Sequence, residues 1–241
     1  MDEGTVVDEV AEGIFRISTY LYDFVTFNQY LVVADEPLLF HCGMRAIYDQ
    51  VAAAAARVLA PERLRWIAFG HVEADECGSM NRWLADAPNA VVAHGALGCI
   101  VQVNDLADRE PRGLDDGETL DLGGRQVRHL ATPHVPHGWD ARVLYEERTG
   151  TLFGGDLFSQ GGNGPALSTA DPVGPAIAYE DRLPFSSLGP TTVDTIRRLA
   201  ELAPQRIALM HGPVLEGDGR RALLDLADFY QARIEARTGP R

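Results

Sequence analysis

Two runs of strand-like segments, each followed by helix-like segments, constrain the fold of this 241-residue chain more than any other feature. The strand-like segments are rich in Val, Ile, Phe, Tyr and Thr, and turn-forming residues separate them. The helix-like segments repeat apolar residues at three- to four-residue spacing. Strands are predicted at residues 5–10, 13–19, 26–34, 38–40, 64–69, 90–93, 118–122, 126–131, 142–146, 151–153 and 206–210. Helices are predicted at residues 45–59, 78–87, 190–202 and 219–237, and a long loop at 159–175.

This order of elements predicts an α/β fold with two layers of sheet. The two halves share an order of elements, although no residue-level repeat relates them. A strictly alternating parallel sheet fits poorly, because several strands follow one another directly at the start of each half. We therefore predict a sandwich of two mixed β-sheets, packed face to face with helices outside. The length and the lack of a linker predict one domain over residues 1–241.

The charge of the chain excludes several classes of partner. Its 21 basic and 35 acidic residues give a net charge of −14, which repels phosphate backbones and anionic membrane surfaces. The longest uncharged apolar stretch, 89–104, is too short and too polar to cross a bilayer. The acidic N-terminus lacks a secretion-signal pattern. We expect a cytoplasmic protein with neither a nucleic acid nor a membrane as partner.

Side chains that can bind metal follow several of the predicted strands. His71, Glu73 and Asp75 come directly after the strand at 64–69, and an extended segment would project all three to one side. One such group is usually a polar surface turn, but further groups follow three later strands. These are His137, Asp156 and His211. We predict that these side chains line one edge of the sandwich.

The spacing of these residues resembles that of the metallo-β-lactamase superfamily. A His-x-Glu-x-Asp motif is followed by a His, 18 intervening residues, an Asp and a later His. Glu in the second position is typical of the flavodiiron and oxygen-binding di-iron branch. Segments 28–32 (NQYLV), 154–158 (GGDLF) and 211–213 (HGP) resemble further blocks of the family, so the resemblance covers most of the chain. It implies the αββα sandwich of that superfamily.

The resemblance also implies two metal ions that share one carboxylate. The first ion would take four ligands: His71, Glu73, His137 and Asp156. The second would take three ligands: Asp75, Asp156 and His211. His137 is preferred to His134 because of its spacing to Asp156, which leaves His134 as an outer or loop histidine.

Two positions depart from the family pattern. Many relatives have a histidine after the motif aspartate, whereas this chain has Glu76, which would add a carboxylate oxygen or leave a water. The aspartate of the family's DTG turn, which lies behind the metals, is replaced by His41. Both changes alter the surroundings of the ligands.

The ligand set favours iron over zinc. Zinc hydrolases of the superfamily have a histidine where Glu73 stands, and exchange of imidazole for carboxylate favours harder ions such as iron or manganese. We therefore expect a di-iron centre that binds or reduces dioxygen or nitric oxide, with Trp139, Phe153 and Phe158 as candidate walls of a gas pocket. The chain has no room for the flavodoxin-like domain of the relatives, so we expect a separate reductase.

Two other functions stay open from the sequence. One is a zinc-dependent hydrolase, in which the metals activate a hydroxide against a small ester or thioester. The other is an oxygen-binding or sensing module without turnover. A homodimer is expected only by analogy with the family.

Overall fold

The first sheet is antiparallel over its first four strands and parallel over the rest. The computed structural model describes residues 4–239. Strands β1 to β4 are joined by short turns, whereas helical segments connect β4, β5, β6 and β7. The strands, in spatial order, are β1 (Val6–Ala11), β2 (Ile14–Leu21), β3 (Val25–Val32), β4 (Leu38–Phe40), β5 (Trp66–Ala68), β6 (Val91–Gly95) and β7 (Arg112–Leu114).

The second sheet is also mixed. Strand β11 pairs antiparallel with β10 and parallel with β13, so the direction changes at the centre of this sheet. The strands, in spatial order, are β12 (Leu167–Ser168), β14 (Val214–Glu216), β13 (Arg206–Leu209), β11 (Thr151–Gly155), β10 (Arg142–Glu146), β9 (Gln126–Ala131) and β8 (Thr119–Asp121).

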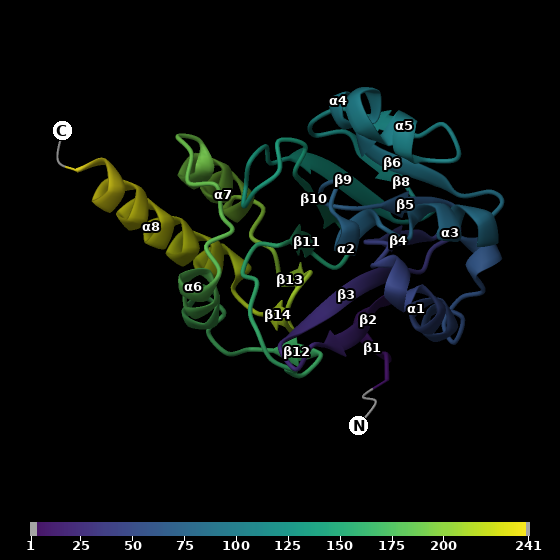
Figure 1. Cartoon of the computed structure of the whole chain (residues 1–241), viewed down its shortest axis with the longest axis horizontal. Helices are drawn as coiled ribbons and strands as arrows, with labels where there is room; N and C mark the ends of the chain where they lie inside the picture. The colour runs from purple at the N-terminus through teal and green to yellow at the C-terminus, as the bar shows by residue number, and fades with distance from the viewer. Residues whose placement is uncertain (1–3, 240–241) are drawn as a thin grey trace.

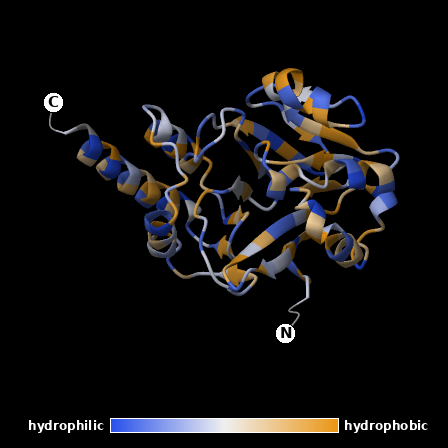
Figure 2. Cartoon of the chain, viewed as in Figure 1, coloured by the Kyte–Doolittle hydropathy of each residue, from blue (hydrophilic) through white to orange (hydrophobic). Residues whose placement is uncertain are grey.

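Helices cover the outer faces of both sheets (Figure 1). They are α1 (Tyr48–Ala55), α2 (Ala74–Cys77), α3 (Met80–Asp86), α4 (Ala96–Gly98), α5 (Asn104–Leu106), α6 (Val173–Arg182), α7 (Thr192–Ala200) and α8 (Gly219–Thr238). Side chains of α1 and α3 pack on the first sheet, and those of α7 and α8 pack on the second. Along α8, hydrophilic and hydrophobic residues alternate as expected for a helix with one buried side (Figure 2).

A third apolar cluster fills the space between the sheets. The ring of Phe153 lies 5.6 Å from that of Tyr30 and 5.3 Å from that of Phe40. Tyr30 and Phe40 belong to the first sheet and Phe153 to the second, and all three are buried. The predicted sandwich of two mixed sheets flanked by helices is therefore confirmed.

Polar contacts tie the sheets together beside this cluster. The side-chain amide of Asn28 in β3 donates to the carbonyl oxygens of Leu209 (2.9 Å) and Gly212 (2.7 Å), and the Tyr30 hydroxyl donates to Leu209 (2.6 Å). Oδ1 of Asn28 accepts from Nε of Arg16. Asn28 thereby fixes the segment that carries His211.

The prediction of a structureless loop at 159–175 is wrong in part. Strand β12 lies inside this range and pairs with β14, and α6 begins at Val173. The carboxylate of Asp171 accepts from the backbone N–H groups of Val173 and Gly174, which satisfies the first turn of the helix. The prolines concealed this helix start in the sequence. Among the described residues, no helix is long and apolar enough to span a membrane.

We predict that Asn28→Ala lowers the free energy of unfolding by about 2–3 kcal/mol. The change leaves the buried Gly212 carbonyl without its side-chain donor and Nε of Arg16 without its acceptor. Tyr30→Phe should cost less, about 1 kcal/mol, because Asn28 still donates to Leu209. Urea unfolding of the three proteins measures both effects. An equal decrease in the free energy of unfolding in the two variants would show that Asn28 does not stabilise the contact between the sheets more than Tyr30 does.

Candidate metal centre

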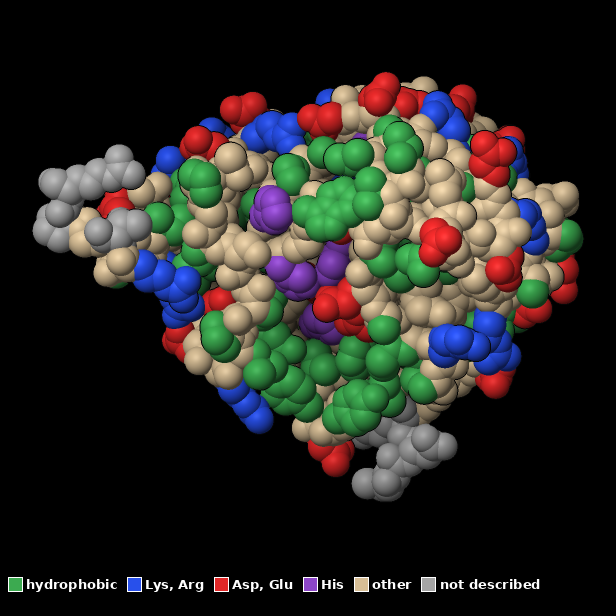
Figure 3. Space-filling view, turned by 45° about the horizontal axis from the view of Figure 1, so that its top comes forward, with side chains coloured by type: hydrophobic (Ala, Val, Ile, Leu, Met, Phe, Trp, Pro, Cys, Tyr) green, Lys and Arg blue, Asp and Glu red, His purple; other side chains and the backbone are tan. Residues whose placement is uncertain are grey.

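Four side chains that can bind metal meet beyond the end of β5. Their donor atoms all lie within 4.8 Å of one another in His71, Glu73, His137 and Asp156. Nε2 of His71 lies 2.9 Å from Oε2 of Glu73, and Nε2 of His137 lies 3.2 Å from the same oxygen. Oδ2 of Asp156 lies 3.3 Å from Nε2 of His137. Histidine and acidic side chains gather in a hollow of the surface (Figure 3).

A second group meets the first at Asp156. Nε2 of His211 lies 3.4 Å from Oδ2 of Asp75 and 3.5 Å from Oδ1 of Asp156. Asp156 thus presents one oxygen to His137 and the other to His211. This is the arrangement expected of a carboxylate shared between two sites.

The local backbone differs from the extended segment that the sequence analysis assumed. Glu73 is extended, but Ala74–Cys77 forms the short helix α2, so Asp75 lies in its first turn. The prediction that simple alternation aligns Asp75 with His71 is therefore wrong. The helical turn, rather than the pleat of a strand, directs the Asp75 carboxylate toward His211.

Glu76 lies behind His71 and contacts it twice. Its Oε2 accepts from the backbone N–H of His71 (2.7 Å), and its Oε1 lies 3.3 Å from Nδ1 of that ring. Nε2 of His41 lies 3.4 Å from the same Oε1. A carboxylate behind a histidine ligand fixes the direction of the ring and raises its basicity. Glu76 and His41 therefore occupy the space behind His71.

His211 is oriented from behind in the same way. Its Nδ1 lies 2.9 Å from the carbonyl oxygen of Thr26, which can only accept, so Nδ1 carries the proton. Nε2 is thereby directed toward Asp75 and Asp156. Gly138 makes room for His71, because a Cβ at Gly138 would lie 3.1 Å from Cδ2 of that ring.

The protonation of these groups shows how strongly the site attracts cations. Burial lowers the pKa of His71, but the neighbouring Glu76 and Glu73 carboxylates outweigh it and raise the pKa to about 12. Burial likewise opposes, and Asp75 and Asp156 promote, a rise in the pKa of His211 to about 9. Protons on the imidazoles balance the carboxylates, and a bound metal would displace them.

A pocket of about 190 Å³ opens onto this centre. Beside the candidate ligands and Ser159, its walls are Tyr179, Leu183 and Phe185, and the ring of Phe185 lies 5.6 Å from that of His137. These walls come from α6 and the segment after it, so the sequence analysis missed them. The sequence signal that could have found these walls is the group of large apolar residues at 179–185, which follows the helix start marked by Asp171.

Four residues singled out in the sequence lie away from this pocket. The ring of Phe158 is buried in the core of the second half, and Phe153 lies between the sheets. Trp139 is 38% exposed and lines a different pocket. His134 is exposed, whereas His137 three residues later contacts Glu73 and Asp156.

The residues present fit a pair of metal ions. Oδ1 of Asp156 is buried and makes no hydrogen bond among the described residues. A buried carboxylate oxygen without a donor is costly unless a cation lies beside it. Three imidazoles and three carboxylates form a donor set suited to a hard or intermediate divalent ion.

The fold and this set of side chains define a metallo-β-lactamase-fold protein with a carboxylate-rich candidate metal centre. Residues 25–171 match the family described as ODP family beta lactamase, and the chain belongs to that family. The recognition of the flavodiiron branch from sequence is confirmed by the relatives.

Three comparisons support this assignment. The Coenzyme F420H(2) oxidase of Methanothermobacter marburgensis is 29% identical over 58% of this chain and 36% of its own length. The Nitric oxide reductase of Moorella thermoacetica is 22% identical over 88% of this chain and 55% of its own length. The structure of rubredoxin oxygen:oxidoreductase from Desulfovibrio gigas has a TM-score of 0.79 at 18% identity, covering 94% of this chain and 62% of that one. The chain thus spans about a third to a half of these two curated relatives.

We predict that Glu76→Gln weakens metal binding about 10- to 100-fold without unfolding the protein. Glutamine keeps the volume and can still accept from the His71 backbone, but it loses the charge that makes the ring basic. Titration of the apoprotein with Fe²⁺ or Zn²⁺ at fixed pH measures the effect. Cys77→Ser, at the next position, is the control and should bind like the parent. Equal metal affinity of the parent and Glu76→Gln would show that the Glu76 charge does not support metal binding by His71.

Proposed function

We propose that this chain holds a di-iron centre that binds and reduces dioxygen or nitric oxide with electrons from a separate reductase. His71, Glu73, His137 and Asp156 would hold one ion, and Asp75, Asp156 and His211 the other. The observation that carries this proposal is the position of Asp156, whose two oxygens face the two groups. The names of the relatives, an oxidase and a nitric oxide reductase, support the same chemistry.

The iron ions would supply electrons to a diatomic molecule, whereas zinc has no redox chemistry. The chain supplies the surroundings. Glu73 brings a hard oxygen donor where the zinc hydrolases have an imidazole, which favours iron. Tyr179, Leu183 and Phe185 form a largely apolar wall beside the centre, which suits a small neutral gas. Histidines held by Glu76 and Thr26 keep their donor atoms aimed at the centre.

The first experiment tests the proposed function directly. Protein made in iron-rich, zinc-poor medium should contain about two irons per chain, and the reduced protein should gain visible absorption on exposure to air. With a reductase and NADH added, it should consume dioxygen or nitric oxide steadily. Zinc at two per chain under these conditions would favour the hydrolase. Spectral change without steady consumption would favour an oxygen-binding or sensing module.

The shared carboxylate gives a second test. We predict that Asp156→Ala loses more than one metal per chain and keeps its fold, because one side chain would serve both ions. Metal analysis gives the stoichiometry, and circular dichroism confirms the fold. Asp105→Ala, on the exposed surface of α5 outside the centre, is the matched control. Full occupancy in Asp156→Ala would exclude the bridging role.

The choice of metal gives a third test. We predict that Glu73→His takes zinc more readily in competition with iron, because it exchanges a hard anionic oxygen for an imidazole nitrogen. The shift should be modest, since the other ligands remain. Parent and variant are loaded with equal iron and zinc and analysed side by side, with Glu62→His as the control for an exposed site. An unchanged iron-to-zinc ratio would show that Glu73 does not select the metal.

A further inference from the structure

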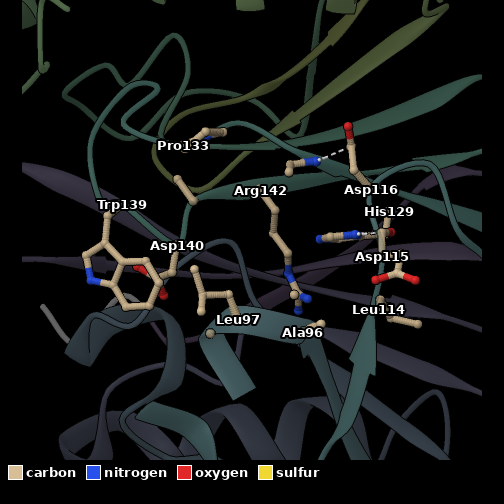
Figure 4. Close-up of a pocket in the computed structure, with 14 residues that line it drawn as sticks. Ala96, Leu97, Leu114, Asp115, Asp116, His129, Pro133, Trp139, Asp140 and Arg142 are labelled. Atoms are coloured by element: carbon tan, nitrogen blue, oxygen red, sulfur yellow. Dashed lines mark hydrogen bonds between the residues drawn. The ribbon is translucent and has the colours of Figure 1, made fainter. Parts of the chain in front are cut away.

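A second pocket lies beside the loop that carries His137, and it shares no residue with the candidate metal centre. Its volume is about 370 Å³, which is in the range of small-molecule sites. Leu97 of α4, Leu114 of β7 and Trp139 of the loop form apolar walls (Figure 4). Arg142 and His129 are among the polar side chains that line the pocket.

Arg142 brings a buried donor to this pocket. The residue is only 2% exposed, and its guanidinium donates to the backbone carbonyl oxygens of Phe69 and Ala93. Among the described residues, Nη1 of Arg142 has no hydrogen-bond partner. Burial lowers the pKa of Arg142 to about 9, so the group stays charged at neutral pH. A buried cationic donor without a partner favours a ligand that supplies an acceptor.

His129 brings a buried acceptor. Its Nδ1 lies 2.8 Å from the carbonyl oxygen of Asp115, which can only accept, so Nδ1 carries the proton. Burial, and then the charge of Arg142, lower the pKa of His129 to about 4, so the ring is neutral. Nε2 is therefore a bare acceptor, and it has no partner among the residues described. In Figure 4 the ring points from Asp115 toward the side chain of Arg142.

We propose that this pocket binds a small uncharged aromatic molecule that carries a carboxamide or lactam group. The carbonyl oxygen of the ligand accepts from Nη1 of Arg142, and its N–H donates to Nε2 of His129. The ring of the ligand packs against Leu97 and Trp139. Both groups carry a carbonyl acceptor next to an N–H donor, which match the unpartnered donor Nη1 of Arg142 and the unpartnered acceptor Nε2 of His129.

The surroundings disfavour an anion of the same shape. Asp115, Asp116 and Asp140 also line the pocket, and their charges repel a carboxylate. A carboxylate has no hydrogen for Nε2 of His129, so two lone pairs would face each other. The carboxylate of Asp140 already accepts from Nε2 of His94 (3.2 Å) and from the Val72 N–H (3.0 Å), which leaves Arg142 and His129 as the unpartnered pair.

The experiment compares three probes of similar shape on the full chain by isothermal titration calorimetry. Benzamide tests the carboxamide, 2-pyridone tests the lactam, and benzoate is the anionic control. At least one of the first two should bind with a Kd on the order of 1 mM, as expected for so small a ligand. Benzoate should bind at least tenfold more weakly.

Variants distinguish binding through the proposed contacts from non-specific binding of the probes. His129→Phe should weaken binding about tenfold, the loss expected for one buried hydrogen bond. Gly95→Val fills the space next to the His129 ring, because a Cβ there would lie 3.7 Å from Nε2 of His129 and the branched side chain extends beyond it. Gly95→Val should abolish binding. It is used in place of a substitution at the buried Arg142, which could prevent folding. Phe185→Ala, in the other pocket, should leave binding unchanged.

Several outcomes would overturn the proposal. Benzoate binding as tightly as benzamide would identify an anion site instead. Binding that survives Gly95→Val, with the fold checked by circular dichroism, would place the probe elsewhere. Failure of both benzamide and 2-pyridone to bind would mean that the unpartnered atoms serve no ligand of this class. None of these results depends on the metal content, so the proposed function is tested separately.

Discussion

The burial of the Asp156 carboxylate between two groups of histidines is the interaction on which the rest of the site depends. Burial raises the pKa of Asp156 to about 6, against the opposing pull of His211 and its neighbours. Burying a carboxylate is costly unless positive charge lies beside it. The two sheets supply that charge from different parts of the chain, with His71 after β5 and His211 after β13. The sandwich is therefore what brings the two halves of the centre together.

The sequence was sufficient for the fold class and for the grouping of His71, Glu73, His137 and Asp156, because spacing along the chain reports the ends of strands. It was not sufficient for the surroundings. Glu76 looked like an extra donor, and only the short helix α2 shows that it turns back toward His71. Local turns of this kind depend on tertiary contacts that have no periodic signal.

The second pocket was invisible in the sequence for a related reason. Arg142 and His129 lie in ordinary strands, β10 and β9, and nothing in their neighbours marks them as unusual. They are unusual because, in the folded chain, Nη1 of Arg142 and Nε2 of His129 are buried without a hydrogen-bond partner among the described residues. The loop at 132–141 lies between the two pockets, with His137 on one and Trp139 on the other. The same ten residues thus support a candidate redox centre and a candidate ligand site.

The lengths of the outermost strands carry a consequence for behaviour at high concentration. Three of the four sheet edges, β7, β8 and β12, are only two or three residues long. Short edges leave few unpaired backbone groups on which another molecule could add a strand. The remaining edge, β1, is six residues long and carries Asp8 and Glu9, whose charges oppose the addition of a further strand. The architecture is thereby protected against edge-to-edge aggregation, and the net charge of −14 opposes non-specific aggregation further.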